Sequence, residues 1–387
     1  MIPQRMHIVL LGGADPRFLG GSARARNTRV AERIRATVST PATLLPDVPG
    51  PVILVPPGVA LTTALFADER FVRITRELQH TWADSTDGGA VAVVDGAAAL
   101  GLGRDPAALA ALPHRAVGGG AHAIDTAANR RRAARAVLLA TGKASDGWVS
   151  RTLNRPVSRA CSRAALFCGM SATGASIVTL LLGLLCAWTA SQPGYVPLVV
   201  TGVLFQIASI LDGVDGEIAR ATLTESASGA RVDTIVDQVT YLACFAGAMV
   251  GWVRETGGTL PITIAAITGI ALVLSLLRAG RFVSAHATNA SFVFVDKAVR
   301  RAAADTGRLP LRLAAASFTL LRRDLFALIF LAASLTGVRV LMPALILAGI
   351  AIANLTFSVF SPELVAAAGR ERADSALSQA RSQPSHV

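Results

Sequence analysis

The stretch at 212–237 reads DGVDGEIARATLTESASGARVDTIVD, and its four aspartates decide how the rest of the chain is interpreted: Asp212, Asp215, Asp233 and Asp237. Positions three, four and seven or eight apart share one face of a helix, so each pair can line a face of its own helix. The polar segment at 222–229 predicts a turn between the two helices. An antiparallel pair would then point four carboxylates at a common point.

Four converging carboxylates predict a site for a divalent cation. Mg²⁺ (or Mn²⁺) binds carboxylate and phosphate oxygens, and two ions can stabilise both the attacking and the leaving oxygen of a phosphoryl displacement. The sequences on either side are apolar, VPLVVTGVLFQIASIL before and TYLACFAGAMVGWV after. Ionisable groups at the ends of such helices are costly, which favours a functional site over acidic residues that only keep a loop solvated.

The residues between the aspartates complete the pattern D-x2-D-G-x2-A-R-x8-G-x3-D-x3-D with Gly216, Ala219, Arg220 and Gly229. This pattern resembles the signature of the CDP-alcohol phosphotransferase (CDP-alcohol phosphatidyltransferase) family, and no position is missing. The resemblance implies an all-α membrane domain of six transmembrane helices. It also implies an enzyme that cleaves a CDP-linked alcohol, releases CMP and joins the phosphoryl group to an acceptor alcohol, and that forms a homodimer among membrane lipids.

The same resemblance implies a role for each motif residue. The four aspartates would hold two Mg²⁺ or Mn²⁺ ions, and Asp237 would also be the base that deprotonates the acceptor hydroxyl. Room for the cytidine would be left by the small residues Gly216, Ala219 and Gly229. Arg220 would lie near the phosphates. A departure lies near the start of the first apolar segment, where family members commonly have Pro-Asn and this chain has Ala175-Ser176.

The charge of the chain points to a membrane surface. The formal net charge is +12, and Lys143 and Lys297 are the only lysines, so arginine carries almost all of it. These arginines cluster beside apolar segments, which favours anionic lipid over nucleic acid as their partner. The four cysteines show no CxxC spacing, so we expect buried thiols without a metal or disulfide role.

The first part of the chain, residues 1–140, predicts an α/β domain. Short apolar runs at 7–13, 51–58 and 89–96 end in glycine and read as strands. Segments that can be helical lie between them, at 28–37 and 68–82. Strands alternating with helices favour a parallel, Rossmann-like sheet of the nucleotide-binding type.

In the inositol branch of the family a nucleotidyltransferase domain precedes the membrane domain, and residues 1–140 resemble such a domain. The loop LLGGADPRFLGG at 10–21 lacks the G-x-G-x-R pattern of that domain, and no lysine precedes Lys143. Asp95 stands where a metal-binding aspartate would be expected. A degenerate, catalytically inactive domain is therefore favoured over an active one.

A basic linker at 141–165 is expected to lie along the membrane surface, since it carries arginines and Trp148. Its portion DGWVSRTLNRPVS at 146–158 resembles the linker of the inositol-phosphate branch; a generic positively charged helix is the alternative. The membrane domain, 166–365, contains six apolar segments at 166–190, 196–211, 235–253, 260–282, 325–340 and 341–360. Residues 366–387 are expected to form a disordered cytoplasmic tail.

The distribution of arginine predicts the orientation. The loop expected at 284–323 is rich in arginine, so the positive-inside rule puts it, the aspartate motif and both termini on the cytoplasmic side of the cell membrane. Arg278 and Arg281, at the end of the fourth apolar segment, can bind an acceptor phosphate, because the guanidinium fork matches phosphate oxygens. Anchoring at the membrane surface is the other role open to them.

Two questions stay open at the level of the sequence. The donor and acceptor are either CDP-inositol with an inositol phosphate, or CDP-diacylglycerol with a polar alcohol such as inositol phosphate. The alternative from a different functional class is a membrane transporter or scaffold, whose aspartates would bind cations without catalysing a reaction. Such a protein would need the carboxylates but would not need Arg220 or Gly229, which favours the enzyme.

Overall fold

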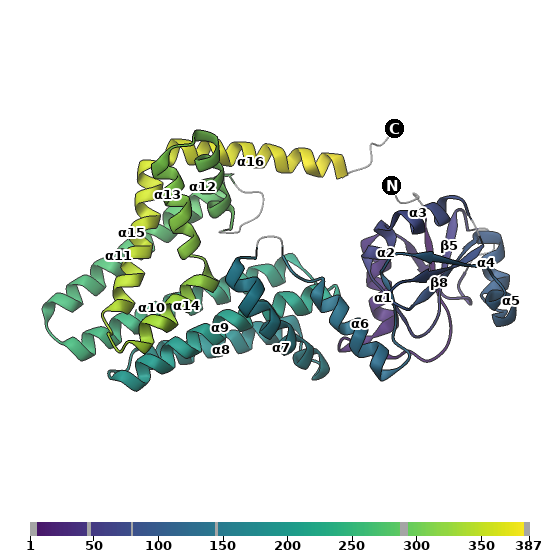
Figure 1. Cartoon of the computed structure of the whole chain (residues 1–387), viewed down its shortest axis with the longest axis horizontal. Coiled ribbons are helices and arrows are strands. Elements are labelled where there is room, and N and C mark those ends of the chain that lie inside the picture. The colour runs from purple at the N-terminus through teal and green to yellow at the C-terminus, as the bar shows by residue number, and fades with distance from the viewer. Residues whose placement is uncertain (1–5, 45–47, 79, 144–145, 287–292, 383–387) are drawn as a thin grey trace. The chain divides into compact units, whose positions relative to one another are not determined.

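The computed structural model describes residues 6–44, 48–78, 80–143, 146–286 and 293–382. The chain forms two compact units (Figure 1). The first contains Met1–Ala144, Ser158–Ala175 and Val214–Ala227, and the second contains Ser145–Val157, Ser176–Gly213 and Ser228–Val387. The first unit is built around a sheet, whereas the second is helical.

The N-terminal sheet has the strand order β4-β1-β5-β8-β7-β9. Its strands are β1 (His7–Leu10), β4 (Thr37–Ser39), β5 (Pro51–Val55), β7 (Thr81–Ser85), β8 (Ala90–Asp95) and β9 (His114–Val117). β1 pairs in parallel with β4 and β5, and β7 with β9, but β8 is antiparallel to both β5 and β7. The α/β class is confirmed, while the expectation of a wholly parallel sheet is wrong.

The antiparallel strand arises from a short hairpin. The sequence between β7 and β8 ends in Asp87-Gly88-Gly89, and Gly88 has a φ of +85°, a conformation that glycine adopts freely. Backbone hydrogen bonds close the turn, from Ser85 N–H to the Gly89 carbonyl at 2.8 Å and from Gly88 N–H to the Ser85 carbonyl at 2.9 Å. The segment at 68–82 is therefore helical only as α3 (Glu69–Arg76), since Trp82 belongs to β7.

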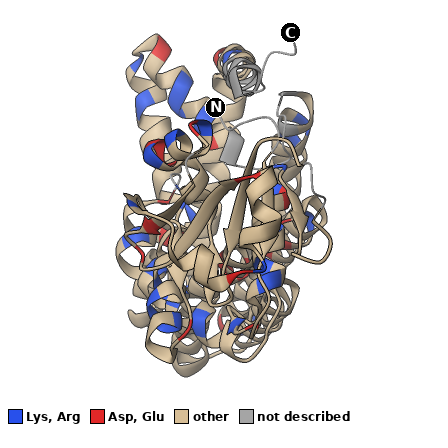
Figure 2. Ribbon diagram, turned by 90° about the vertical axis from the view of Figure 1, so that its right-hand side faces the viewer, with Lys and Arg blue, Asp and Glu red and all other residues tan. Residues whose placement is uncertain are grey.

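The sheet is covered on both faces, which explains its continuous apolar strands. All five residues of β5 are buried. Two buried apolar clusters lie on the sheet, one around Ile8 and Ile53 and the other around Leu54 and Val94. The strands carry few charged residues, whereas many of the Lys and Arg residues lie on helices (Figure 2).

Helices and short strand pairs complete the domain. The helices are α1 (Ala23–Arg33), α2 (Thr63–Ala67), α3, α4 (Gly96–Leu102), α5 (Pro106–Ala110) and α6 (Ala127–Leu139). The short strands β2 (Arg17–Phe18) and β3 (Gly21–Ser22) pair with each other, as do β6 (Val59–Leu61) and β10 (Ala121–Ala123). After α6 the basic linker forms a π-helical turn (Ser150–Asn154) and α7 (Arg155–Phe167).

Five helices among the described residues are long and apolar enough to cross a membrane. They are α8 (Ala172–Ala190), α9 (Tyr195–Thr222), α10 (Ala227–Thr256), α11 (Thr259–His286) and α15 (Leu341–Val359). The segment expected at 325–340 is α14 (Arg323–Leu335), whose 13 residues extend about 20 Å against a hydrocarbon core of about 30 Å. The helical domain is confirmed, but with five such helices instead of six.

The arginine-rich segment at 284–323 is not an open loop where the structure describes it. It forms α12 (Val293–Thr306) and α13 (Leu309–Leu320), and its residues 287–292 lie outside the described residues. α12 packs against both α13 and α16 (Ser361–Ser382), and the three helices share a buried apolar cluster that includes Val299, Leu311 and Leu364. Residues 366–382, expected as a disordered tail, are therefore helical, and 383–387 lie outside the described residues.

Glycines bring α8 and α10 into close contact. A Cβ on Gly247 would lie 2.3 Å from the Ala187 carbonyl oxygen, and one on Gly251 would lie 2.1 Å from that of Ala190. The two glycines are four residues apart and so share a helix face, the small-xxx-small arrangement that lets transmembrane helices approach closely. The approach brings the helix that carries Asp233 and Asp237 against its neighbour.

We expect Gly247→Leu to lower the stability of the helical domain by about 1–3 kcal/mol, the usual cost of forcing bulk into a packed interface. The measurement is thermal unfolding in detergent followed by intrinsic fluorescence. Gly269→Leu is the matched control, because a Cβ there would meet no atom within 4 Å. Equal melting temperatures for the two variants would contradict the close contact of α8 and α10.

Candidate active site

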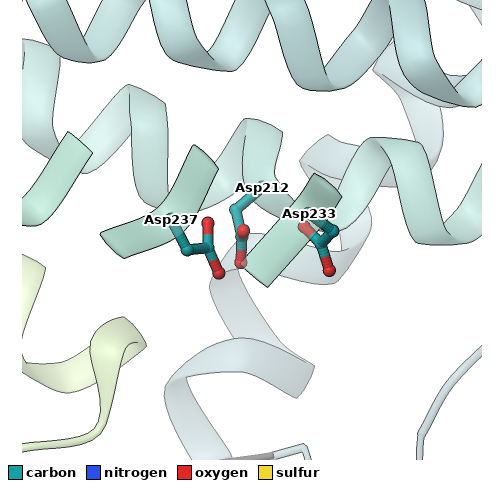
Figure 3. A group of neighbouring side chains, drawn as sticks. All are labelled: Asp212, Asp233 and Asp237. Carbon is teal, nitrogen blue, oxygen red and sulfur yellow. The ribbon is translucent and has the colours of Figure 1, made fainter. Parts of the chain in front are cut away.

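Three of the four motif aspartates come together in the second unit. Asp212 lies on α9, and Asp233 and Asp237 lie about one turn apart on α10. One carboxylate oxygen from each lies within 4.8 Å of the other two, and all three residues are partly buried. Figure 3 shows the side chains from the two helices gathered at one place. The helix pair expected from the spacing is therefore present, joined by the short segment at 223–226.

A cation of the protein already contacts these carboxylates. The guanidinium of Arg323, the first residue of α14, forms ion pairs with both Asp212 and Asp237. The guanidinium carbon also lies 5.1 Å from the ring centroid of Tyr241, one turn beyond Asp237 on α10, in a cation–π contact. The sequence pattern did not identify Arg323, because it lies 86 residues beyond Asp237 along the chain.

The cluster of three aspartate carboxylates has the ligand atoms that a divalent cation requires. Its ligands are hard oxygens from three carboxylates, the donor type that Mg²⁺ and Mn²⁺ prefer. The contact with Arg323 shows that the cluster attracts positive charge, since one guanidinium bonds to two of the three carboxylates. A divalent ion would leave room for substrate oxygens, because three aspartates do not fill an octahedral shell.

Asp215 and Glu217 lie beyond Asp212 on α9 and are both buried, with 7% and 0% exposure. The Asp215 carboxylate accepts a hydrogen bond from the backbone N–H of Gly216. It does not belong to the group formed by the other three aspartates among the described residues, so its role as a fourth ligand stays a prediction. Glu217 accepts hydrogen bonds from the hydroxyls of Ser158 and Ser162 on α7, both at 2.7 Å.

Gly216 and Arg220 lie against each other on α9. A Cβ on Gly216 would lie 2.9 Å from a terminal nitrogen of Arg220, so the glycine leaves room for this guanidinium. The Nε of Arg220 donates to the Thr141 carbonyl at 2.9 Å. Ala219 is partly buried on the same helix, and Gly229 is exposed near the start of α10. That these residues bind CDP stays a prediction.

The two candidate acceptor-phosphate residues both lie on α11 and are exposed. Arg278 Nη1 donates to the Asn354 side-chain oxygen at 3.3 Å and to the Ser358 hydroxyl at 3.2 Å, both on α15. Arg281 lies about one turn further along α11. Their role in phosphate binding stays a prediction.

The middle part of the linker, residues 146–157, packs within the second unit. The guanidinium of Arg155 binds both carboxylate oxygens of Asp146, with two N–O distances of 2.9 Å, in a buried ion pair. The backbone N–H of Ser150 donates to the Asp324 carboxylate at 2.9 Å. Asp324 follows Arg323, so the linker contacts the first turn of the helix that supplies the guanidinium to the aspartate cluster.

Comparison with known proteins finds similarity in the helical part of the chain. Residues 170–352 match the family model described as CDP-alcohol phosphatidyltransferase. Three relatives named "Bifunctional IPC transferase and DIPP synthase" come from Thermococcus kodakarensis, Archaeoglobus fulgidus and Aquifex aeolicus. Their identities are 39% over 131 residues, 39% over 116 and 34% over 128.

These regions of similarity make up 33%, 30% and 33% of this chain and 29%, 23% and 28% of the respective relatives. The chain thus spans less than a third of the length of the curated relatives that it matches. The aspartate cluster on α9 and α10 and the guanidinium of Arg323 both fall inside the segment that matches the family model. Residues 170–352 are therefore similar to the CDP-alcohol phosphatidyltransferase family in the segment that holds the aspartate cluster.

Proposed function

We propose that this protein is a membrane-embedded CDP-alcohol phosphotransferase that depends on a divalent cation. The observation that carries the proposal is the convergence of Asp212, Asp233 and Asp237 on two helices within the segment that matches the family model. The complete motif around them supports it, because a cation-binding scaffold would not require Arg220 or the motif glycines. The substrates are a CDP-linked alcohol and an acceptor alcohol.

The reaction is an in-line displacement at the β-phosphorus of the donor. The acceptor oxygen forms a new P–O bond, the bond from this phosphorus to the oxygen of CMP breaks, and the acceptor proton passes to Asp237. Arg220 stabilises the charge that develops on the departing CMP. The motif aspartates, Asp215 included, would hold two Mg²⁺ or Mn²⁺ ions, which would supply positive charge to neutralise the pyrophosphate.

Arg323 has a place in this scheme as well. In the structure its guanidinium pairs with Asp212 and Asp237. The same carboxylates would hold the divalent cations, and the Arg323 guanidinium would then be available to a phosphate oxygen of a substrate. Arg278 and Arg281 are further candidates for contacts with an acceptor phosphate.

We infer that the substrates belong to the inositol-phosphate class. The linker at 146–158 resembles that of the inositol branch, and the relatives carry both IPC transferase and DIPP synthase in their names. The active site then opens to the cytoplasm, where CDP-linked substrates are present. The apolar helices, the exposed Trp148 and the exposed arginines Arg163 on α7 and Arg300 on α12 are consistent with contacts to membrane lipids.

The experiment that tests the function is CMP release by the purified protein in detergent. CDP-inositol and CDP-diacylglycerol are compared as donors, each with inositol 1-phosphate as acceptor and with Mg²⁺ or EDTA. We expect Mg²⁺-dependent release from CDP-inositol. Release from only the lipid donor would overturn the choice of donor, and no release from either would contradict the proposed function for inositol-phosphate substrates.

The N-terminal domain is unsuited to nucleotidyl transfer. Asp15 lies in the loop after β1, where its carboxylate accepts hydrogen bonds from the Ser22 hydroxyl and from Arg24 N–H at 2.9 Å. Its slight burial opposes ionisation, but these hydrogen bonds and the charge of Arg24 lower the pKa of Asp15 overall. An ionised carboxylate thus occupies the N-terminus of α1, which is the position that would otherwise attract a phosphate.

We therefore expect the full chain to form no CDP-inositol from CTP and inositol 1-phosphate. Product formation is measured by chromatography with Mg²⁺ present and inorganic pyrophosphatase added, so that equilibrium does not limit the yield. Asp15→Asn should also form no CDP-inositol, because loss of the negative charge alone does not create the G-x-G-x-R pattern and the lysine that this domain lacks. Formation of CDP-inositol by the unaltered chain would refute the view that the domain is inactive.

A further inference from the structure

The first unit joins helix α1 of the sheet domain to the C-terminal end of α9. Three arginines of α1 lie on one face of this helix, since Arg29 and Arg33 follow Arg26 by three and seven residues. Arg26 donates to the Ala221 carbonyl, and Arg29 donates to the Thr222 carbonyl at 3.0 Å. Arg33 forms an ion pair with Glu225. The contacts thus follow the chain from the last turn of α9 into the connection to α10.

The hydrogen bonds from Arg26 and Arg29 complete the C-terminal cap of α9, which also contains two backbone hydrogen bonds. The backbone N–H of Leu223 donates to the Arg220 carbonyl at 3.3 Å, and that of Thr224 donates to the Ala219 carbonyl at 2.9 Å. This is the pattern of a Schellman motif, which satisfies two of the four carbonyls left free at a helix end. The other two belong to Ala221 and Thr222, and they accept from the α1 arginines.

Leu223 shows that the sheet domain stabilises this turn. Its φ is +58°, in the left-handed region that favours glycine. The Leu223 side chain packs against the buried apolar cluster of the N-terminal sheet. Glycine could not make this contact, so the packing explains why a leucine occupies a position where the backbone alone would favour glycine.

Arg26 is buried within the sheet domain. It is 4% exposed, and its guanidinium carbon lies 5.8 Å from the ring centroid of Phe18. The neighbouring Asn27 fixes α1 to β6, since its side chain donates to the Val59 carbonyl and accepts from Leu61 N–H, both at 2.8 Å. Burial, with a smaller effect of Arg29, lowers the pKa of Arg26 to about 10, so it stays charged at neutral pH.

Arg220, in the last turn of α9, is held by the same unit. Its carbonyl takes part in the cap, and its Nε donates to the Thr141 carbonyl just after α6. We propose that the N-terminal domain is a positioning element of the phosphotransferase site, in which Arg26 and Arg29 fix the last turn of α9 and thereby place Arg220 for the donor pyrophosphate. The inference rests on the proposed function. It gives a domain without nucleotidyl transfer a role in donor binding.

The test compares the full-length double variant Arg26→Gln/Arg29→Gln with Arg24→Gln. Arg24 lies on the same helix and is exposed, so its variant removes one positive charge from α1 without touching the α9 cap. We expect the double variant to raise the KM for the CDP-linked donor about tenfold, the effect of losing about 1.4 kcal/mol of positioning. The KM for the acceptor should stay within twofold, and Arg24→Gln should leave both unchanged.

Hydrogen–deuterium exchange provides a readout that does not require turnover. The amides of residues 222–226 should exchange faster in the double variant, while those of β5 and β8 stay protected, which shows that the domain is folded. Arg26→Lys, which retains a charge and a donor, should recover part of the donor KM. Unchanged exchange at 222–226, or a donor KM that does not move, would overturn the inference.

Failure of the proposed function is distinguishable from failure of this inference. If the unaltered protein releases no CMP from any donor, the phosphotransferase assignment fails, and with it the role of the contact in donor binding. Faster exchange in the double variant would then still establish the contact between α1 and α9. If the unaltered protein is active and the double variant matches it in donor KM, only the positioning role is refuted.

Discussion

Asp237→Asn should reduce CMP release by about 10³-fold or more, because the change removes both a proposed base and a charged metal ligand. General bases alone contribute about 10²–10⁴-fold. Asp237 and Asp212 both form ion pairs with Arg323. One carboxylate oxygen of Asp237 lies within 4.8 Å of an oxygen of each of the other two aspartates. Asparagine has nearly the same shape, so the helices should pack as before. The measurement is initial-rate CMP release with saturating donor and Mg²⁺.

Asp105→Asn is the matched control for this loss. Asp105 caps α5, where its side chain accepts from Ala107 N–H at 3.0 Å and Ala108 N–H at 3.1 Å. Asparagine is an equally good N-cap, so this variant should keep full activity and stability. If Asp237→Asn kept more than a tenth of the rate while remaining folded, Asp237 would not be the base.

Arg323→Gln should make the stability of the helical domain strongly dependent on divalent cations. The guanidinium pairs with Asp212 and Asp237, and without it their negative charges repel across the cluster. In EDTA we expect a loss of about 1–3 kcal/mol, the scale for breaking hydrogen bonds to charged groups. Mg²⁺ should recover most of this loss, because the ion neutralises the same carboxylates. The stabilisation by Mg²⁺ should therefore be larger in the variant than in the unaltered protein.

The measurement is the melting temperature in detergent as a function of free Mg²⁺, with catalytic rates from the same preparations. Arg312→Gln serves as the control, since Arg312 is exposed on α13 and its replacement removes the same charge. This control should show the Mg²⁺ response of the unaltered protein. An identical Mg²⁺ response in Arg323→Gln would show that Arg323 and the metal do not share the aspartates.

The aspartate cluster could be predicted from the sequence because helical spacing alone determines which residues share a face. Asp233 and Asp237 are four residues apart, and a short polar connection to α9 leaves Asp212 opposite them. Arg323 could not be found in this way, since its contact depends on how α14 packs against α9 and α10. The sequence also predicts too long a helix for α14, because the apolar pattern continues past Leu335 into the turn before α15.

The sheet shows a similar division. The strands β1, β5 and β8 could be predicted from their apolar runs, but β7 could not, because its sequence TWADS mixes polar and apolar residues. Without β7 the sequence indicates no hairpin, and the alternation of strands and helices predicts a parallel sheet. The contacts of Arg26 and Arg29 are likewise invisible in the sequence, since their partners are backbone carbonyls that any residue would supply.

The most direct test of the phosphotransferase assignment follows the β-phosphorus of the donor. A CDP-linked inositol with ³²P at that position is incubated with the protein, inositol 1-phosphate and Mg²⁺, and the products are separated. We predict that the label appears in a phosphodiester with the acceptor, that the released CMP is unlabelled, and that EDTA or Asp237→Asn abolishes the transfer. Label that stays in the donor, or that appears only in free inositol phosphate through hydrolysis, would contradict the account.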